Sequence, residues 1–170
     1  MNTTELIQYS LGNAFDILGQ VTADLTQEQA DSMPAGIANP IGALYWHTIS
    51  CVDDIVNHWA RGQATLGERA GWPERMLAAA PKGEPETLAE MRSVRIRLPE
   101  VHEYARAVAA EVQAWLGSLT PADLERKMDT PIGHLNVAQM LEIFVLWHIN
   151  AHCGEISALK GCQGCRGYPF

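Results

Sequence analysis

Apolar residues recur every three or four positions through four long stretches of this 170-residue chain, a spacing typical of amphipathic helices. Val, Ile, Thr and aromatic residues never alternate with polar residues for long enough to indicate a sheet. The sequence therefore predicts an all-α fold. The four predicted helices extend over residues 4–24, 40–62, 99–117 and 137–160.

Capping residues mark where these helices begin. Either the Asn2–Glu5 capping-box pattern or Thr3 caps the first helix, and Asn136 caps the fourth. Asn39 is the predicted N-cap of the second helix, with Pro40 at its first helical position, where proline is favoured. These signals indicate that the helices have defined starts.

The connections between the helices differ in length. Residues 63–98 are rich in Gly, Pro and charge, and they form a long crossover between the second and third helices. A long crossover allows these two helices to run in the same direction, which makes the second and fourth antiparallel. We therefore predict a single domain over residues 1–170, folded as a four-helix bundle.

Three histidines lie on the apolar faces of the second and fourth predicted helices. His148 and His152 are four residues apart, so they share one face of the fourth helix about 6 Å apart along its axis. His47 has a similar setting in the second helix, with Cys51 one turn further on. If the two helices run antiparallel with aligned ends, His47 lies at the level of the other two. We therefore expect all three imidazoles to point into the bundle.

Buried imidazoles need hydrogen-bond partners, and three in one core need several. One metal ion would serve all three, because neutral imidazole is the commonest metal ligand. We predict that His47, His148 and His152 bind Zn²⁺, Ni²⁺ or Fe²⁺, among which the sequence does not choose. The alternative is that they are core histidines satisfied by other protein groups. Cys51 is either a fourth ligand that closes the site or a small core residue.

Other side chains are weaker candidates for chemistry. Asp54 and Glu155 each lie two turns from a predicted histidine ligand, where each is a candidate base, a hydrogen-bond partner of a ligand, or a solvated residue. Cys162 and Cys165 form a C-x-x-C pattern that, if functional, is half a zinc site or a redox pair.

Three clustered arginines (Arg92, Arg95 and Arg97) are either a site for a carboxylated substrate or a solvated face. The remaining histidines are expected to take no part in the site, because they lie too far along the helix or beside charged and loop residues. They are His58, His102 and His134, of which the last two are expected to be exposed.

Charge and composition exclude several classes of function. The net charge of −8, with 20 acidic and 12 basic side chains, argues against nucleic acid as a partner. We find no signal-peptide pattern and no stretch of about 20 apolar residues, so we expect a cytoplasmic protein without a membrane span. Its partner is expected to be a small-molecule substrate.

The order of these motifs resembles the DinB/YfiT-like superfamily. The resemblance rests on a histidine early in the second helix, the H-x-x-x-H of the fourth and the Gly-Glu-Ile and Leu-Lys-Gly tripeptides that follow it. The Asn39-Pro40 pair, the turn at residues 119–124 and the tail at residues 163–170 also fit. The resemblance covers nearly the whole chain.

The resemblance implies up-down-down-up topology and a metal site formed by His47, His148 and His152. Family members of known activity include isomerases and S-transferases that use mycothiol, bacillithiol or related low-molecular-weight thiols. The chain is therefore expected to be a metal-dependent thiol S-transferase, or a related transferase or hydrolase, acting on a small electrophile, and a homodimer. The alternative is a non-catalytic, stress-associated bundle whose metal or dimer interface is structural.

Overall fold

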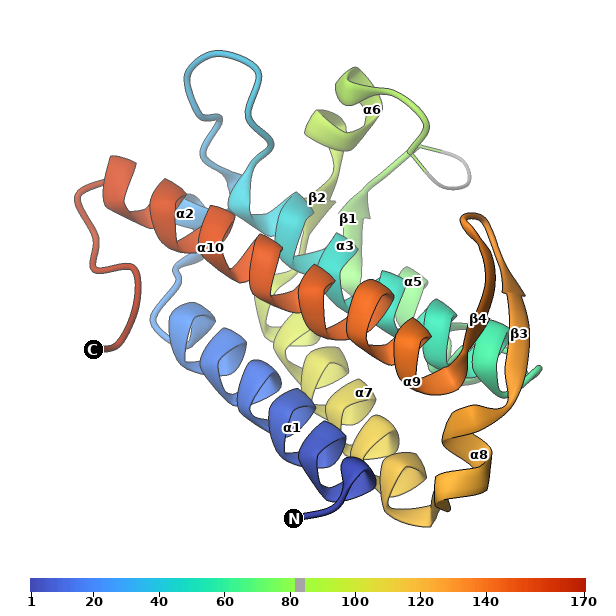
Figure 1. Ribbon diagram of the computed structural model, residues 1–170. Helices are drawn as coiled ribbons and strands as arrows, with labels where there is room; N and C mark the ends of the chain where they lie inside the picture. Colours follow the sequence, from blue (N-terminus) through green and yellow to red (C-terminus); the bar gives the residue numbers. More distant parts are fainter. Residues whose placement is uncertain (82–84) are drawn as a thin grey trace.

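The computed structural model describes residues 1–81 and 85–170, and the chain is mostly helical, as the periodicity predicts. Four long helical segments form its body (Figure 1). The second continues into a π-helical segment, η1, and the fourth contains another, η2. Their bounds are Thr3–Thr22 (α1), Ile41–Asp53 (α3), Asp54–Ala60 (η1), Leu98–Ser118 (α7), Val137–Met140 (α9), Leu141–Leu146 (η2) and Trp147–Cys162 (α10).

The predicted caps are confirmed at α1 and α9. The side chain of Asn2 accepts a hydrogen bond from the Glu5 amide at 2.9 Å, and the Asn2 amide donates to Glu5 Oε2 at 2.8 Å. Asn136 and Gln139 form the same reciprocal pair before α9. Each box supplies an acceptor to a backbone N–H that has no partner within the helix.

The predicted start of α3 is wrong by one residue. Pro40, not Asn39, is its N-cap, and no side chain caps this end. The reason is the extended backbone of Pro40, with ψ at 148°, which places the first helical residue at Ile41. Asn39 Oδ1 is instead buried without a hydrogen-bond partner among the described residues.

Short elements join the long helices, and four of them are strands that the sequence did not predict. β1 pairs with β2 and β3 pairs with β4, both antiparallel. None exceeds four residues, which is too short for alternation to be recognised. The short helices are Gln27–Asp31 (α2), Leu66–Ala70 (α4), Trp72–Met76 (α5), Leu88–Ser93 (α6) and Pro121–Glu125 (α8). The strands are Leu77–Ala79 (β1), Arg95–Ile96 (β2), Lys127–Thr130 (β3) and Gly133–Asn136 (β4).

The four long segments surround one apolar core. α1 contacts both α7 and α10, and α3 contacts the same two helices. Figure 1 shows α1 and α10 running toward one end of the molecule and α3 and α7 running toward the other. The antiparallel packing of α3 against α10 positions the candidate site. Large, fully buried residues of the core include Leu11, Leu18, Ile41, Ile49, Tyr104, Leu116, Met140, Leu141, Ile149 and Ile156.

The π-helical segment η2 changes which residues of the last helix are buried. A π turn contains an additional residue and so rotates the helix that follows it. The buried side chains of α10 include Ile149 and Cys153, each one residue beyond a histidine that the periodicity placed in the core, together with Ile156, which the periodicity also placed there. His148 and His152 are therefore half-buried at the edge of the helix. The expectation that they point into the bundle core is wrong.

Candidate metal centre

The three predicted histidines meet where α3 packs against α10. His47 projects from α3, and His148 and His152 project from successive turns of α10. Each offers a ring nitrogen within 4.8 Å of those of the other two. Within residues 1–81 and 85–170, they are the one group of three or more His, Cys, Asp or Glu side chains that meets this limit.

The imidazole rings form a compact triangle. The ring centroid of His47 lies 5.2 Å from that of His148 and 5.1 Å from that of His152. The ring centroids of His148 and His152 are 4.5 Å apart. All three pairs are edge-to-face, with interplanar angles of 61°, 82° and 84°. Small side-chain rotations can bring these nitrogens onto one ion with metal–nitrogen bonds of about 2.0–2.1 Å.

The surroundings of the cluster favour the neutral form of His47 and His148. Burial, reinforced by the neighbouring His152 and His47, lowers the pKa of His148 from 6.5 to about 4. Burial and the proximity of His152 also lower the pKa of His47, against a smaller opposing effect of Glu155. Neutral imidazoles have the free lone pair that metal coordination requires.

One atom of the cluster has no partner within the protein. His148 Nε2 is buried and makes no hydrogen bond to any described residue. A buried polar atom without a partner costs about 1–3 kcal/mol, so such atoms are rare in folded proteins. The orphaned nitrogen lies beside two other imidazoles, a donor set that suits a divalent transition metal or zinc. The residues present therefore fit a metal ion.

Glu155 holds the third imidazole in place. Its Oε2 lies 2.6 Å from Nδ1 of His152, one turn away on α10. A carboxylate at this nitrogen accepts the ring N–H and leaves Nε2 free as the ligand atom, as in the carboxylate–histidine–metal arrangement of many metalloproteins. Of the roles considered for Glu155, this geometry favours that of hydrogen-bond partner of a ligand.

Cys51 and Asp54 lie beside the cluster without joining it. Cys51 Sγ is 3.4 Å from His47 Nδ1, but Cys51 is outside the group that meets the 4.8 Å limit. Asp54 Oδ1 is 3.2 Å from Nδ1 of the exposed His58, which is itself no member of the cluster. Asp54 and Cys51 both line the cavity next to His47.

The cluster borders a small, largely apolar cavity of about 210 Å³. Its wall contains Trp59 and Phe144, whose rings pack edge-to-face 5.5 Å apart, and Trp147, which is 66% exposed. The sequence did not lead us to predict that these aromatic residues line the site. The available signal was position: Phe144 precedes His148 by one helical turn, on the same edge of the helix.

The other predicted candidates are not brought to this site. Cys162 and Cys165 are both free thiols, and neither belongs to the histidine cluster. The three clustered arginines instead donate hydrogen bonds to backbone carbonyls: Arg92 to Ala38, Arg95 to Arg92 and Val94, and Arg97 to Arg75 and Leu77. These bonds favour a structural role over a substrate site.

Among the remaining histidines, one expectation fails. His134 is exposed, as predicted, and its Nδ1 lies 2.5 Å from Oδ1 of Asp129. His102 is half-buried rather than exposed, and its Nδ1 lies 3.1 Å from the hydroxyl of Tyr45. Its position near the start of α7, beside a deep groove next to α1, accounts for the difference.

Comparison with known proteins agrees with this architecture. In a search of solved structures, the chain is similar to a protein described as a conserved protein of locus from Enterococcus faecalis, with a TM-score of 0.78. The two are 19% identical, and the match covers 94% of this chain and 96% of that one, so the similarity shows a shared fold. No curated protein matches. No helix among the described residues is long and apolar enough to cross a membrane.

A family-level match covers most of the chain. A model described as the DinB superfamily matches residues 13–156, a span that contains α3, the histidine cluster and Glu155. The chain belongs to the DinB superfamily.

Proposed function

We propose that His47, His148 and His152 bind one divalent metal ion (Zn, Ni or Fe), and that the protein is a metal-dependent thiol S-transferase, or a related transferase or hydrolase, acting on a small electrophile. The observation that carries the proposal is the buried, unpartnered Nε2 of His148, which lies beside two further imidazoles. Membership of the DinB superfamily supports it.

The three histidines would hold the ion, with Glu155 fixing the orientation of His152 through the 2.6 Å contact. A bound divalent ion would supply Lewis acidity, which lowers the pKa of a coordinated low-molecular-weight thiol and favours its thiolate at neutral pH. Three protein ligands, rather than four, leave a position for such a thiol.

The cavity beside the histidines fits a small apolar electrophile. Trp59, Phe144 and Trp147 give it an aromatic wall against which an apolar substrate would pack. Asp54 is its one carboxylate among the described lining residues, and it is the candidate base for a proton released there. At about 210 Å³ the cavity is smaller than a typical drug-sized site, so we expect compact substrates.

The first test is metal content per chain by elemental mass spectrometry, after purification without chelator. We expect near one equivalent in the wild type, loss in His148→Ala, and retention in His134→Ala, which removes an exposed histidine. Turnover of electrophiles with a panel of low-molecular-weight thiols should then require both the metal and the thiol. Absence of metal from the wild type, even after reloading, would exclude the proposal.

A non-catalytic metal site is the second candidate, and the position of Cys51 favours it. Its sulfur lies 3.4 Å from His47 Nδ1, so a modest shift would make it a fourth ligand and close the coordination sphere. In that case Cys51→Ser would lower metal affinity, and no thiol would give turnover. In the catalytic case Cys51→Ser would keep the metal.

The family context leads to three further proposals about the whole molecule. We infer that the opposed directions of the four long helices correspond to the up-down-down-up bundle of the family. We also propose a homodimer, which sedimentation velocity at two protein concentrations would test. A cytoplasmic location is proposed from the sequence, and fractionation of cells that express the chain would test it.

A further inference from the structure

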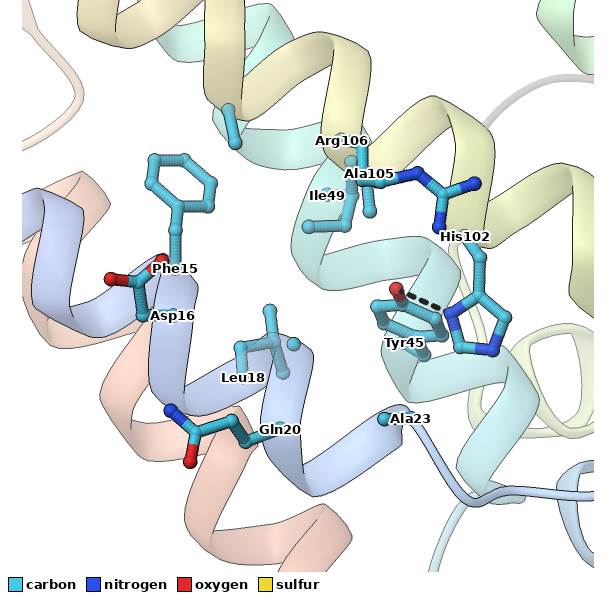
Figure 2. A pocket seen from close by; sticks show the side chains of 12 residues that line it. Phe15, Asp16, Leu18, Gln20, Ala23, Tyr45, Ile49, His102, Ala105 and Arg106 are labelled. Carbon is cyan, nitrogen blue, oxygen red and sulfur yellow. Dashed lines mark hydrogen bonds between the residues drawn. The ribbon is translucent and has the colours of Figure 1, made fainter.

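A second and larger cavity, of about 560 Å³, lies between α1 and α7 (Figure 2). Its floor is formed by Tyr45 and Ile49 of α3. Tyr45 precedes His47 by two residues, and side chains two residues apart on a helix point about 200° apart. α3 therefore directs them to opposite sides, and among the described residues none lines both cavities. We call this second cavity the α1–α7 groove.

The groove exists because α1 and α7 touch at one end and part at the other. Near the start of α1, Gln8 Nε2 donates to the Leu116 carbonyl at 2.7 Å. One turn on, a Cβ at Gly12 would lie 3.4 Å from the side-chain nitrogen of Gln113. At Gly19 a Cβ would meet no atom within 4 Å. The two helices are therefore in contact at Gly12 and separated at Gly19.

The far end of the groove is also fixed. Beyond α1, the Gln27 side chain bridges to the start of α7: its Nε2 donates to the Ile96 carbonyl at 2.9 Å, and its Oε1 accepts from the Leu98 amide at 3.0 Å. Hydrogen bonds thus connect the N-terminal part of the chain to both ends of α7. This bracing keeps the groove from closing by a simple approach of the helices.

One wall of the groove carries hydrogen-bonding groups and a positive charge. The hydroxyl of Tyr45 lies 3.1 Å from His102 Nδ1, and Arg106 follows His102 by one turn of α7 (Figure 2). Burial, reinforced by the charge of Arg106, lowers the pKa of His102, so the imidazole is neutral at pH 7. The charge of this wall is therefore that of Arg106.

Arg106 differs from the other arginines of the chain. Each of the others donates a hydrogen bond to a carboxylate, amide or carbonyl oxygen, whereas Arg106 has no ion pair or hydrogen bond to any described residue. A guanidinium pairs most strongly with a carboxylate or phosphate, to which it donates two parallel hydrogen bonds. Arg106 is thus available to an anion that enters the groove.

The remainder of the groove is mainly apolar. Phe15 and Leu18 of α1 face Ala105 of α7 across it (Figure 2), and its volume is within the range of about 300–1,000 Å³ typical of small-molecule sites. Asp16 lines the groove from α1, on the opposite wall from Arg106. Its carboxylate disfavours a second negative charge on a bound molecule.

We propose that the α1–α7 groove binds a small organic monoanion, with its carboxylate at Arg106 and its apolar body against Phe15, Leu18 and Ile49. The site is separate from the histidine cluster, and its occupancy requires neither the metal nor the activity proposed above. The unpaired guanidinium favours a ligand with a negative charge, and the apolar walls favour a ligand with an apolar body.

Isothermal titration calorimetry with 2-naphthoate, on the full chain purified without chelator, tests the proposal. We expect saturable binding of one molecule per chain, and weaker binding of 2-naphthalenemethanol, which has the same rings without the charge. Arg106→Gln should weaken naphthoate binding by about fivefold to tenfold, and Arg106→Lys should restore part of the loss. Lys127→Gln removes an exposed positive charge from β3 and should have no effect.

Variants that fill the groove locate the ligand. Ala109→Trp in α7 and Ala23→Phe, directly after α1, should each abolish binding while melting as cooperatively as the wild type. His148→Ala should bind naphthoate as the wild type does. The proposal is overturned if the wild type shows no saturable binding, if Arg106→Gln and both filled variants bind normally, or if His148→Ala alone loses binding. It is equally overturned if sedimentation velocity shows a dimer that both filled variants disrupt, since the groove is then an interface between copies.

Discussion

The histidine cluster and the cluster around Asp53 are both built on α3, yet they differ in how well their polar atoms are satisfied. Asp53 is fully buried, and each of its carboxylate oxygens accepts two hydrogen bonds. Oδ1 accepts from Asn57 Nδ2 and the Leu66 amide, and Oδ2 accepts from the Gly67 amide and the Tyr104 hydroxyl. In the histidine cluster, by contrast, His148 Nε2 accepts none.

The difference separates a structural cluster from a binding cluster. Asp53 ties the start of α4 and the middle of α7 to α3, and its acceptors are saturated, so it has no capacity for a ligand. The histidines contact one another through edges that carry nitrogen atoms, and the protein leaves one of these atoms unpaired. A site that binds an ion has to keep such capacity open.

The largest effect on stability is expected at the cluster around Asp53. Asp53→Ala removes the carboxylate that accepts hydrogen bonds from two backbone amides, the Asn57 side chain and the Tyr104 hydroxyl, which should lower the free energy of unfolding by about 3–5 kcal/mol. Urea denaturation measures this change. Asp129→Ala, which removes an exposed carboxylate, should change the free energy by less than about 0.5 kcal/mol. A loss below about 1 kcal/mol for Asp53→Ala would show that the cluster is not structural.

At the histidine cluster, the effect of a substitution on stability is expected to depend on bound metal. With zinc at a hundredfold excess over its dissociation constant, the wild type should gain about 2.7 kcal/mol of stability, and His148→Ala should gain almost none. Denaturation curves with added zinc and with chelator give both values. His134→Ala should behave as the wild type. Equal stabilisation of His148→Ala would remove this histidine from the site.

Glu155 should have a smaller effect, confined to metal affinity. Glu155→Gln keeps an oxygen near His152 Nδ1 but removes the negative charge, so we expect metal affinity to fall by about 10- to 100-fold. Competition with a chromophoric chelator measures the affinity. Glu142→Gln, an exposed change in η2, is the matched control and should leave affinity unaltered. Unchanged affinity in Glu155→Gln would contradict the role assigned to this carboxylate.

The grouping of the three histidines was predictable from sequence, whereas the cluster around Asp53 was not. His148 and His152 share a helical face whatever surrounds them, and His47 follows from antiparallel packing. Asp53 is next to Asp54, and nothing local distinguishes them. Burial of Asp53 depends on the amides of Leu66 and Gly67, which arrive through the crossover 13 and 14 residues later.

The same distinction between local and tertiary causes applies to the fold. The caps at Asn2 and Asn136 depend on residues three positions apart, and both cap residues were predicted correctly, although the box with Gln139 was not. The π-helical segments depend on how the helices pack. Periodicity alone therefore placed His148 and His152 in the core, whereas they are half-buried at the edge of the helix. Strands as short as β2, with two residues, have no pattern that can be recognised.

The histidine cluster should also respond to pH in the metal-free protein. His148 has a folded-state pKa of about 4 against an ordinary 6.5, so the unfolded chain binds more protons in this interval. Stability is therefore complete above about pH 6.5 and is lost as the pH falls through about 4, by about 1–2 kcal/mol after allowance for solvent screening. Denaturation midpoints across this range, compared with those of His148→Asn, isolate the effect. Parallel curves for the two proteins would contradict it.

The C-x-x-C after the last helix should have the smallest effect, although sequence alone does not separate it from a metal or redox site. Cys165 Sγ accepts a hydrogen bond from Gln29 Nε2 at 2.9 Å, and Cys162 is exposed. Cys165→Ser should cost less than about 1 kcal/mol because a hydroxyl accepts the same bond, and Cys162→Ser should cost nothing measurable. Metal content should stay unchanged in both. Loss of metal in either variant would show that the metal is bound near Cys162 and Cys165 rather than by the histidines of α3 and α10.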